Sequence, residues 1–278
     1  FLIGYQNFVE NPGTKLPIGV FDSGIGGISV LAEIIKALPC EEFVYFADTL
    51  HSPYGTKPED VVRSLSIKVA EFLALMGIKS LVIACNTATS VAISEIRRKY
   101  PFPVIGMEPA LKPAVELGLI GKILVMATPL TLKSKKFNVQ VQYYKHRAEI
   151  VPLPCEGLVE IIEHDHSGGR EIREYLAQVF SPANTRDISA IVLGCTHYVL
   201  IKKEIADIVG SKVVIVDGNC GTARHLRTML QNERLLNTAL AEKLHVPLKA
   251  QVRFYVSGIE GEVMITKCKQ LLQNEGIV

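Results

Sequence analysis

The sequence predicts an α/β fold made of two similar domains, each with a mostly parallel sheet covered by helices. Short apolar runs rich in Val and Ile alternate with longer segments of helical period, which is the pattern of buried parallel strands joined by helices. Related positions in the two halves of the chain are separated by nearly constant distances. With 278 residues, 48% of them hydrophobic, the chain can bury a substantial core.

Apolar runs of five or six residues mark eight candidate strands in chain order. They cover 18–22, 43–47, 81–85 and 103–107 in the first half, and 122–127, 149–153, 190–195 and 212–217 in the second. The segments between them have the helical period expected of the crossovers that parallel strands need. A ninth run, 252–258, follows the second set, and we expect it to complete the sheet of the first half.

The two halves resemble copies of one unit. Cys195 follows Cys85 by 110 positions, and Thr128 follows Ser23 by 105, so strand ends and the turns after them recur in register. We therefore expect two pseudo-twofold related domains with an active site in the cleft between them. The predicted bounds are 1–108 plus 222–278 for a discontinuous first domain and 109–221 for the second.

Composition and charge favour a small-molecule partner and a cytoplasmic location. The 30 basic and 28 acidic side chains leave a formal net charge of +2, which gives no electrostatic reason to bind nucleic acid or a membrane surface. No apolar run reaches the roughly 18 residues that span a bilayer, and the N-terminal segment lacks the layout of a signal peptide. The six cysteines are too sparse for a disulfide framework and form no C-x-x-C pair, so we expect free thiols and no zinc.

The segment VFDSGIGGISVL at 20–31 carries Asp22 and Ser23 past the first predicted strand, into a turn with three glycines. A dinucleotide fingerprint needs glycine where Ser29 stands, and no phosphate-loop lysine follows. An aspartyl-phosphatase has a second carboxylate where Gly24 stands. We predict an anion-binding turn whose glycines let the backbone approach a ligand; the alternative is that Asp22 or Ser23 simply caps a helix.

Cys85 and Cys195 occupy the same place in the two halves. Each follows an apolar run, within ACNTAT and GCTHY, and precedes a segment of helical period. Ligands bind at this edge of an open parallel sheet, and helix N-termini stabilise thiolates, so we expect lowered pKa values and two usable bases. The alternative is that both are small buried core residues, which their matched positions disfavour.

Two further segments carry polar residues after predicted strands. The loop 48–60 contains Tyr54 and Gly55 and is a candidate lid, although most such loops are only connections. Thr128 and Thr131 stand at the position equivalent to the Asp22 turn. Their hydroxyls contact ligand or cap a helix, and the sequence leaves both interpretations open.

A cluster of glutamates and histidines at 155–169 invites a metal-site interpretation. On a helix, His164 and His166 would point apart, because neighbours on one face are three or four residues away. A solvated face is the better interpretation for most of these charges. Glu163 adjoins an apolar stripe and can turn inward.

Two thiols that approach one cleft from opposite sides suit inversion at the α-carbon of an amino acid. One abstracts the proton as a thiolate while the other donates a proton to the opposite face, and the reverse reaction exchanges the roles. Helix N-termini with Ser, Asn and Thr side chains can hold the substrate carboxylates. Asp22 and His197 are placed to tune the thiols or to relay protons to them.

Five motifs in this order, IGVFDSGIGGISVL, YFADTLHSPYGTK, VIACNTAT, MEPALKPA and VLGCTHYVL, resemble those of the glutamate racemases, which belong to the cofactor-independent aspartate/glutamate racemase superfamily. The similarity extends from about residue 17 to the C-terminus. It implies interconversion of L- and D-glutamate without pyridoxal phosphate or metal, supply of D-glutamate for bacterial peptidoglycan, and a homodimer. Aspartate or another amino acid as substrate, or a non-catalytic amino-acid-binding regulator, are the alternatives.

The resemblance also implies roles for single residues. Cys85 matches the thiol that acts on D-glutamate and Cys195 the thiol that acts on L-glutamate, with Asp22, His197 and Glu163 as assisting groups. The implied substrate contacts are Asp22, Ser23, Pro53, Tyr54, Gly55, Asn86, Thr87, Thr128, Thr131, Thr196 and His197.

Overall fold

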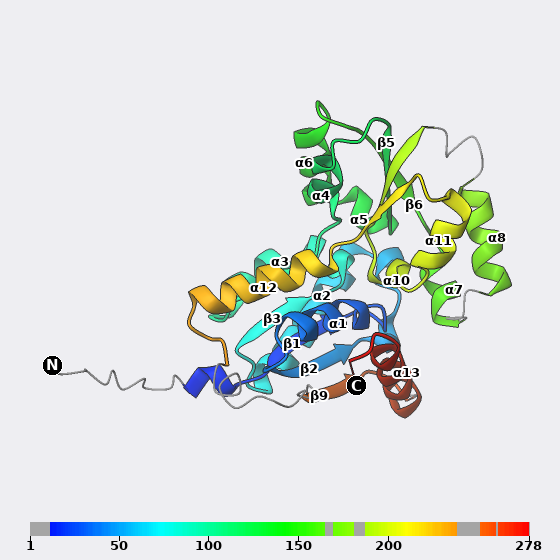
Figure 1. Cartoon of the computed structure of the whole chain (residues 1–278). Coiled ribbons are helices and arrows are strands. Elements are labelled where there is room, and N and C mark those ends of the chain that lie inside the picture. Colours follow the sequence, from blue (N-terminus) through cyan, green and yellow to red (C-terminus); the bar gives the residue numbers. More distant parts are fainter. Residues whose placement is uncertain (1–11, 165–168, 181–186, 238–250, 260, 278) are drawn as a thin grey trace.

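The computed structural model describes residues 12–164, 169–180, 187–237, 251–259 and 261–277, which form two α/β lobes (Figure 1). The first lobe contains η1 (Pro12–Lys15), β1 (Ile18–Asp22), α1 (Ile28–Ala37), β2 (Glu42–Ala47), η2 (Thr49–His51), η3 (Tyr54–Thr56), α2 (Glu59–Leu75), β3 (Ser80–Ile83), α3 (Asn86–Lys99), β4 (Val104–Gly106), α12 (Asn219–Asn232), β9 (Gln251–Val256) and α13 (Gly261–Asn274). The second contains α4 (Leu111–Glu116), β5 (Lys122–Ala127), α5 (Pro129–Lys133), α6 (Lys135–Tyr144), β6 (Glu149–Pro154), α7 (Leu158–His164), α8 (Arg170–Val179), β7 (Ile188–Leu193), α10 (Thr196–Val199), α11 (Lys202–Val209) and β8 (Val214–Val216).

The two sheets repeat one strand order. Within the described residues, the first lobe has a five-stranded sheet with the order β4-β3-β1-β2-β9, and the second has a four-stranded sheet that reads β8-β7-β5-β6. All pairings are parallel. Pairing β1 with β5, β2 with β6, β3 with β7 and β4 with β8 makes the orders identical, so the predicted fold class and its internal repeat are confirmed.

The last predicted strand returns to the first sheet, as expected. β9 pairs in parallel with β2, from Gln251 against Glu42 to Val256 against Ala47. The helix α12 also belongs with the first lobe, because its buried Ala223 and Leu226 pack in the same cluster as α1. The exact bounds of the two domains stay a prediction.

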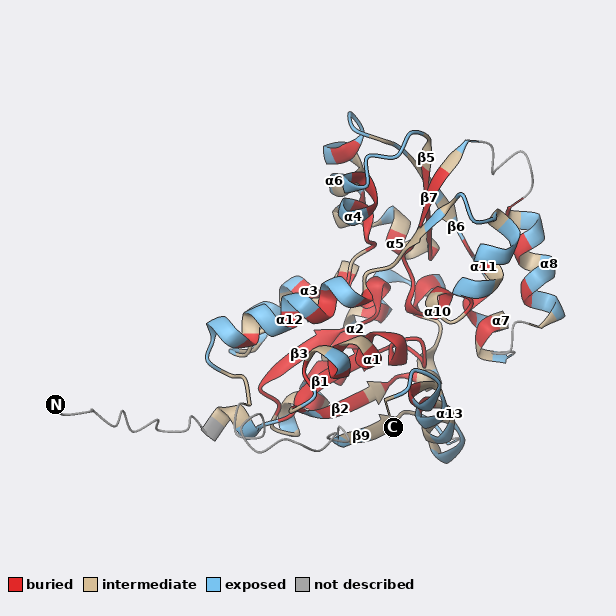
Figure 2. Ribbon diagram, in the orientation of Figure 1, coloured by how far each residue is buried: buried red, intermediate tan, exposed pale blue. Residues whose placement is uncertain are grey.

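Helices cover both faces of each sheet, which explains why the strands are continuous apolar runs. In the first lobe, one core lies between the sheet and α1, α12 and α13, and a second lies on the face of α2 and α3. The second lobe likewise has two cores, one with α7 and α8 and the other with α4 and α6. Figure 2 shows the resulting pattern of buried strands and helices with exposed outer surfaces.

The strands before the two cysteines end earlier than predicted. β3 ends at Ile83 and β7 at Leu193, so Cys85 and Cys195 lie two residues beyond their strands, as the N-caps of α3 and α10. This places both thiols in the turn between a strand and a helix. No helix among the described residues is long and apolar enough to cross a membrane.

Candidate active site

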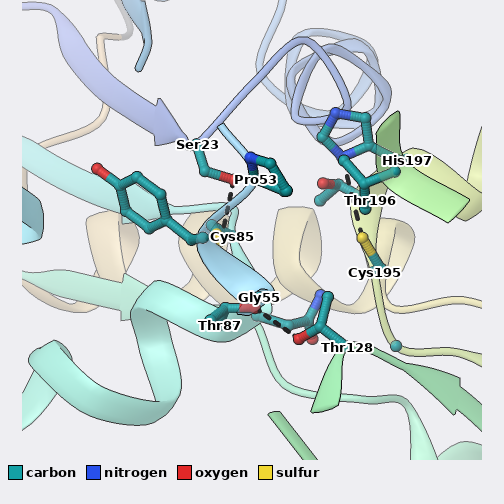
Figure 3. A pocket seen from close by; sticks show the side chains of 13 residues that line it. Ser23, Pro53, Gly55, Cys85, Thr87, Thr128, Cys195, Thr196 and His197 are labelled. Carbon is teal, nitrogen blue, oxygen red and sulfur yellow. Dashed lines mark hydrogen bonds between the residues drawn. The ribbon is translucent and has the colours of Figure 1, made fainter. Parts of the chain in front are cut away.

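A small pocket lies between the lobes, at the carboxyl ends of the central strands of both sheets. The cavity has a volume of about 10 Å³, roughly the room that one water molecule needs, so the two lobes are nearly closed on the site. Figure 3 shows Ser23 and Cys85 on one side of it and Cys195 and His197 on the other. The lining residues are Ser23, Pro53, Tyr54, Gly55, Cys85, Asn86, Thr87, Thr128, Val159, Gly194, Cys195, Thr196 and His197.

Most of the residues singled out in the sequence meet at this pocket. Asp22, Thr131 and Glu163 do not line it, but each bonds to a residue that does. Sequence reasoning missed Val159 and Gly194. The sequence marks Val159 only as an apolar residue of a helix that faces the core. Gly194 could have been found from its place directly before Cys195. A Cβ at Gly194 would lie 2.9 Å from Met126 O, so the turn needs glycine there.

Cys85 is buried in the cleft between the lobes, with 6% of its surface exposed. Its thiol donates to Ser23 Oγ at 3.4 Å, and its sulfur accepts the Ala88 N–H at 3.4 Å. Burial raises the pKa of Cys85 to about 12, with a further rise from the carboxylate of Asp22, while the Ser23 and Ala88 contacts lower it. The predicted lowering of the pKa at this helix N-terminus is therefore wrong for Cys85, because desolvation of the thiolate outweighs the helix N–H groups.

Asp22 lies beneath the turn that it was predicted to shape, with no exposed surface. Its Oδ2 accepts the N–H groups of Gly27 at 2.9 Å and Gly24 at 3.3 Å, and the Thr196 hydroxyl of the other lobe lies 3.4 Å from both carboxylate oxygens. Burial raises its pKa, against the lowering effects of His197 and the two backbone N–H groups. Asp22 thus joins the turn of one lobe to α10 of the other.

Cys195 adjoins an imidazole that is held across the lobes. His197 Nδ1 lies 3.9 Å from the Cys195 sulfur, and His197 Nε2 lies 2.9 Å from Glu163 Oε1. Ser52 of the first lobe donates to the same Glu163 oxygen at 3.0 Å. Burial, the largest effect, lowers the pKa of His197, but its bonds to Cys195 and Glu163 together raise it well above its usual value.

The glycines of the Asp22 turn accommodate the other lobe. A Cβ on Gly26 would lie 2.6 Å from the backbone nitrogen of His197 and 2.7 Å from Thr196 Oγ1, and a Cβ on Gly24 would lie 2.2 Å from Glu163 Oε1. We predicted that these glycines let the backbone approach a ligand. In the structure, they instead allow α10 and Glu163 to pack directly on the turn.

Three threonine hydroxyls form a second link between the lobes. Thr87 Oγ1 lies 2.9 Å from Thr128 Oγ1 and 3.1 Å from Thr131 Oγ1, and Thr128 also caps α5. Capping by Thr128 is therefore confirmed; Thr128 also lines the pocket, and contact of its hydroxyl with a ligand stays a prediction. Beside them, the side-chain amide of Asn86 is buried, and neither its oxygen nor its nitrogen has a hydrogen-bond partner within the described part of the protein. Such an amide is suited to a bound ligand.

The histidine and glutamate cluster of 155–169 does not assemble at one point. Glu163 turns toward His197, whereas His164 is exposed and His166 lies outside the described residues. Among the side chains that the structure describes, no group of three or more His, Cys, Asp or Glu could hold a metal ion.

Comparison with known proteins agrees with this geometry. Residues 23–226 match the family model of Asp/Glu/hydantoin racemases. The chain is 50% identical to a glutamate racemase of Clostridium novyi over 93% of its own length and 98% of that protein. It superposes with a TM-score of 0.77 on a Francisella tularensis glutamate racemase in complex with D-glutamate (30% identity, 94% of both chains). The TM-score is also 0.77 for the Escherichia coli glutamate racemase with L-glutamate and the activator UDP-MurNAc-Ala (27% identity, 92% and 95% of the chains).

Proposed function

The chain belongs to the Asp/Glu/hydantoin racemase family, and we propose that it interconverts L- and D-glutamate by proton transfer between the substrate α-carbon and two cysteines. The observation that supports this most strongly is the placement of Cys85 and Cys195. They follow equivalent strands of two repeated lobes and line one enclosed pocket from opposite sides. An α-carbon held between them is accessible to a different sulfur on each face.

The reaction moves one proton onto the enzyme and another off it. The thiolate of one cysteine takes the α-proton, and the electron pair of the broken C–H bond stays on the α-carbon, which becomes a carbanion. The thiol of the other cysteine then protonates that carbanion on the opposite face. The product has inverted configuration, and the two cysteines have exchanged protonation states.

Cys85 needs a charge partner to act as the base, because burial alone keeps its thiol protonated near neutral pH. The ammonium group of a bound amino acid supplies a positive charge inside the cleft and stabilises a thiolate there. Ser23 Oγ already lies within hydrogen-bond distance of the sulfur, and the Ala88 N–H donates to it. We propose that Cys85 removes the α-proton of D-glutamate once these three groups act together.

Cys195 has a different assistant. His197 lies against its sulfur and keeps its own charge through Glu163, so an imidazolium is available to stabilise the Cys195 thiolate or to return a proton to it. We propose that Cys195 removes the α-proton of L-glutamate. In this proposal Asp22 holds the turn and the α10 hydroxyl in place rather than acting as a further base.

The substrate carboxylates would be held by neutral donors. We assign this role to the Asn86 amide, to the Thr87, Thr128 and Thr196 hydroxyls, and to the backbone N–H groups of the strand–helix turns. Ser23 and the Pro53–Gly55 segment would close the pocket on the remaining sides. The bound D- and L-glutamate of the two solved relatives support glutamate over aspartate for this chain.

The test is racemisation in deuterium oxide with each enantiomer of glutamate and of aspartate, followed by circular dichroism and mass spectrometry. The buffer contains EDTA and no pyridoxal phosphate, since we expect neither a metal nor a cofactor to be required. Loss of optical activity of glutamate, with one α-deuterium in the product, is the expected result. Racemisation of aspartate alone would overturn the substrate, and absence of deuterium from every amino acid would indicate a binding protein.

The same proposal covers the cellular role. D-Glutamate made by this reaction would supply peptidoglycan synthesis in the cytoplasm, and we expect the enzyme to act as a homodimer. Growth of a D-glutamate auxotroph on plates without D-glutamate tests the first point, and sedimentation equilibrium tests the second.

A further inference from the structure

Ser257, directly after the last strand β9, clamps the start of the loop that forms one wall of the pocket. Its N–H donates to Ala47 O at 3.0 Å, and its hydroxyl donates to Asp48 Oδ1 at 2.6 Å. The Leu50 N–H donates to the same hydroxyl at 3.0 Å, and the Thr49 hydroxyl donates to the Ser257 carbonyl at 2.8 Å. One residue from the C-terminal segment thus bonds to the last residue of β2 and to the first three residues of the loop.

Asp48 extends this clamp to the pocket. Its carboxylate is 3% exposed, and besides Ser257 it accepts the Tyr54 hydroxyl on Oδ2 at 2.5 Å and lies 2.8 Å from His51 Nδ1. Tyr54 lines the pocket, and the next residue, Gly55, abuts it as well. A path of two hydrogen bonds to a buried carboxylate therefore joins Ser257 to the pocket wall.

The loop is packed tightly against the other lobe at Gly55. A Cβ on Gly55 would lie 2.4 Å from the Thr128 Cβ, so the Tyr54–Gly55 backbone is packed tightly against the second lobe. Without its Ser257 donor, Asp48 Oδ1 keeps only the contact with the part-exposed His51 ring, so the acceptor of the Tyr54 hydroxyl is held less firmly. The wall would become less well defined although Ser257 itself does not line the pocket.

We propose that Ser257 is a positioning residue for the racemase reaction, acting through Asp48 on the Tyr54–Gly55 wall. The inference rests on the proposed function. It gives the C-terminal segment a part in substrate binding besides completing the first sheet. Because a wall binds substrate and transition state alike, its loosening should raise KM more than it lowers kcat.

The first experiment compares Ser257→Ala, Ser257→Thr and the wild type in the racemisation of both glutamate enantiomers. For Ser257→Ala we expect KM to rise by about tenfold in both directions, the equivalent of one hydrogen bond to a charged group, with kcat changed by less than about threefold. Ser257→Thr keeps the hydroxyl and should restore most of the loss. Ser189→Ala is the matched control, since it removes a serine hydroxyl of the second lobe that donates to Lys122 O at 3.2 Å and does not line the pocket.

A double-mutant cycle with Tyr54→Phe removes the other end of the same path. If both hydroxyls act through Asp48, the KM increase of the double variant should be clearly smaller than the product of the single increases. Multiplying effects would show that Ser257 and Tyr54 act independently and would overturn the proposed path.

Amide hydrogen exchange separates this inference from the proposed function. In Ser257→Ala, we expect faster exchange confined to residues 47–56, whether or not glutamate is the substrate. If exchange is faster but KM is unchanged, or if KM rises equally in Ser257→Ala and Ser257→Thr, then Ser257 is only a structural residue and the proposal fails. If the wild type racemises neither enantiomer, the proposed function fails, and the exchange data still decide whether the clamp exists.

Discussion

Gly26→Ala should separate the two halves of the active site while leaving each lobe folded. The added Cβ would lie 2.6 Å from the backbone nitrogen of His197, and 2.7 Å from both His197 Nδ1 and Thr196 Oγ1. Ordinary contact begins near 3.4 Å, so the first turn of α10 has to retreat by about 0.8 Å (3.4 − 2.6 Å). Backbone cannot swing aside as a flexible side chain can, and Cys195 directly precedes this turn.

A displacement approaching 1 Å at one of two opposed bases costs on the order of a hundredfold in rate. We therefore expect kcat for racemisation of either glutamate enantiomer, followed by circular dichroism, to fall by about that factor. Gly24→Ala should cost less, because the end of the Glu163 side chain can move away from its Cβ.

The matched control is Gly221→Ala in α12, where the new Cβ would meet nothing within 4 Å. It should leave kcat unchanged and raise the free energy of unfolding by roughly 0.5–1 kcal/mol, as expected for alanine in place of a helical glycine. Far-ultraviolet circular dichroism and urea unfolding confirm that Gly26→Ala remains folded. A folded Gly26→Ala variant with wild-type kcat would show that the contact between the turn and α10 does not determine the position of Cys195 in the active site.

Three further predictions follow from the site and its surroundings. Cys85→Ser and Cys195→Ser should each lower the rate of racemisation by a factor of about 10²–10⁴, as for a lost general base, and full activity in either would remove that residue from the mechanism. Ser52→Ala removes a donor to Glu163 and should lower kcat about tenfold. The α-deuterium isotope effect on kcat should grow for the enantiomer that Cys195 deprotonates and shrink for the other enantiomer. Equal isotope effects for the two enantiomers would contradict the assignment of Glu163 and His197 to Cys195. The pKa of the buried Cys268 is raised from 9.0 to about 12 by burial, so the folded state keeps a proton that the unfolded state releases, and stability is lost as pH rises between those values. Urea unfolding at pH 8 and pH 10 should show a decline in the free energy of unfolding that is smaller in Cys268→Ala by about 1.4 kcal/mol in total, and identical declines would refute this assignment.

The sequence was informative wherever the signal is local or repeated. Buried parallel strands are continuous apolar runs, so their places and the internal repeat could be read directly, and the repeat in turn indicated that Cys85 and Cys195 share one edge of two related sheets. Strand ends were less accurate, since the pairing with the neighbouring strand ends at Ile83 and Leu193, whereas apolar residues continue past these points into the turns at Ala84 and Gly194.

Contacts between lobes could not be predicted in the same way. The need for Gly26 arises from α10, about 170 residues later, and the bonds of Ser52 to Glu163 and of Ser257 to Asp48 span 111 and 209 positions. No periodicity encodes such pairs. The prediction of a lowered pKa for Cys85 was wrong for a related reason. The helix N-terminus is visible in the sequence, but the burial of the thiol is a property of the assembled cleft.

The surroundings of each cysteine include contacts with the other lobe. Asp22 receives the Thr196 hydroxyl, Thr87 meets Thr128, and His197 is held by Glu163, which Ser52 of the opposite lobe also contacts. A symmetric pair of strand–helix turns would supply two equivalent thiols, but these cross-contacts make the thiols unequal. Cys85 depends on a hydroxyl and a backbone N–H of its own lobe, whereas Cys195 depends on an imidazole held by both lobes. In the proposed mechanism one sulfur is charged while the other is protonated, and this inequality gives the two protonation states different stabilising groups.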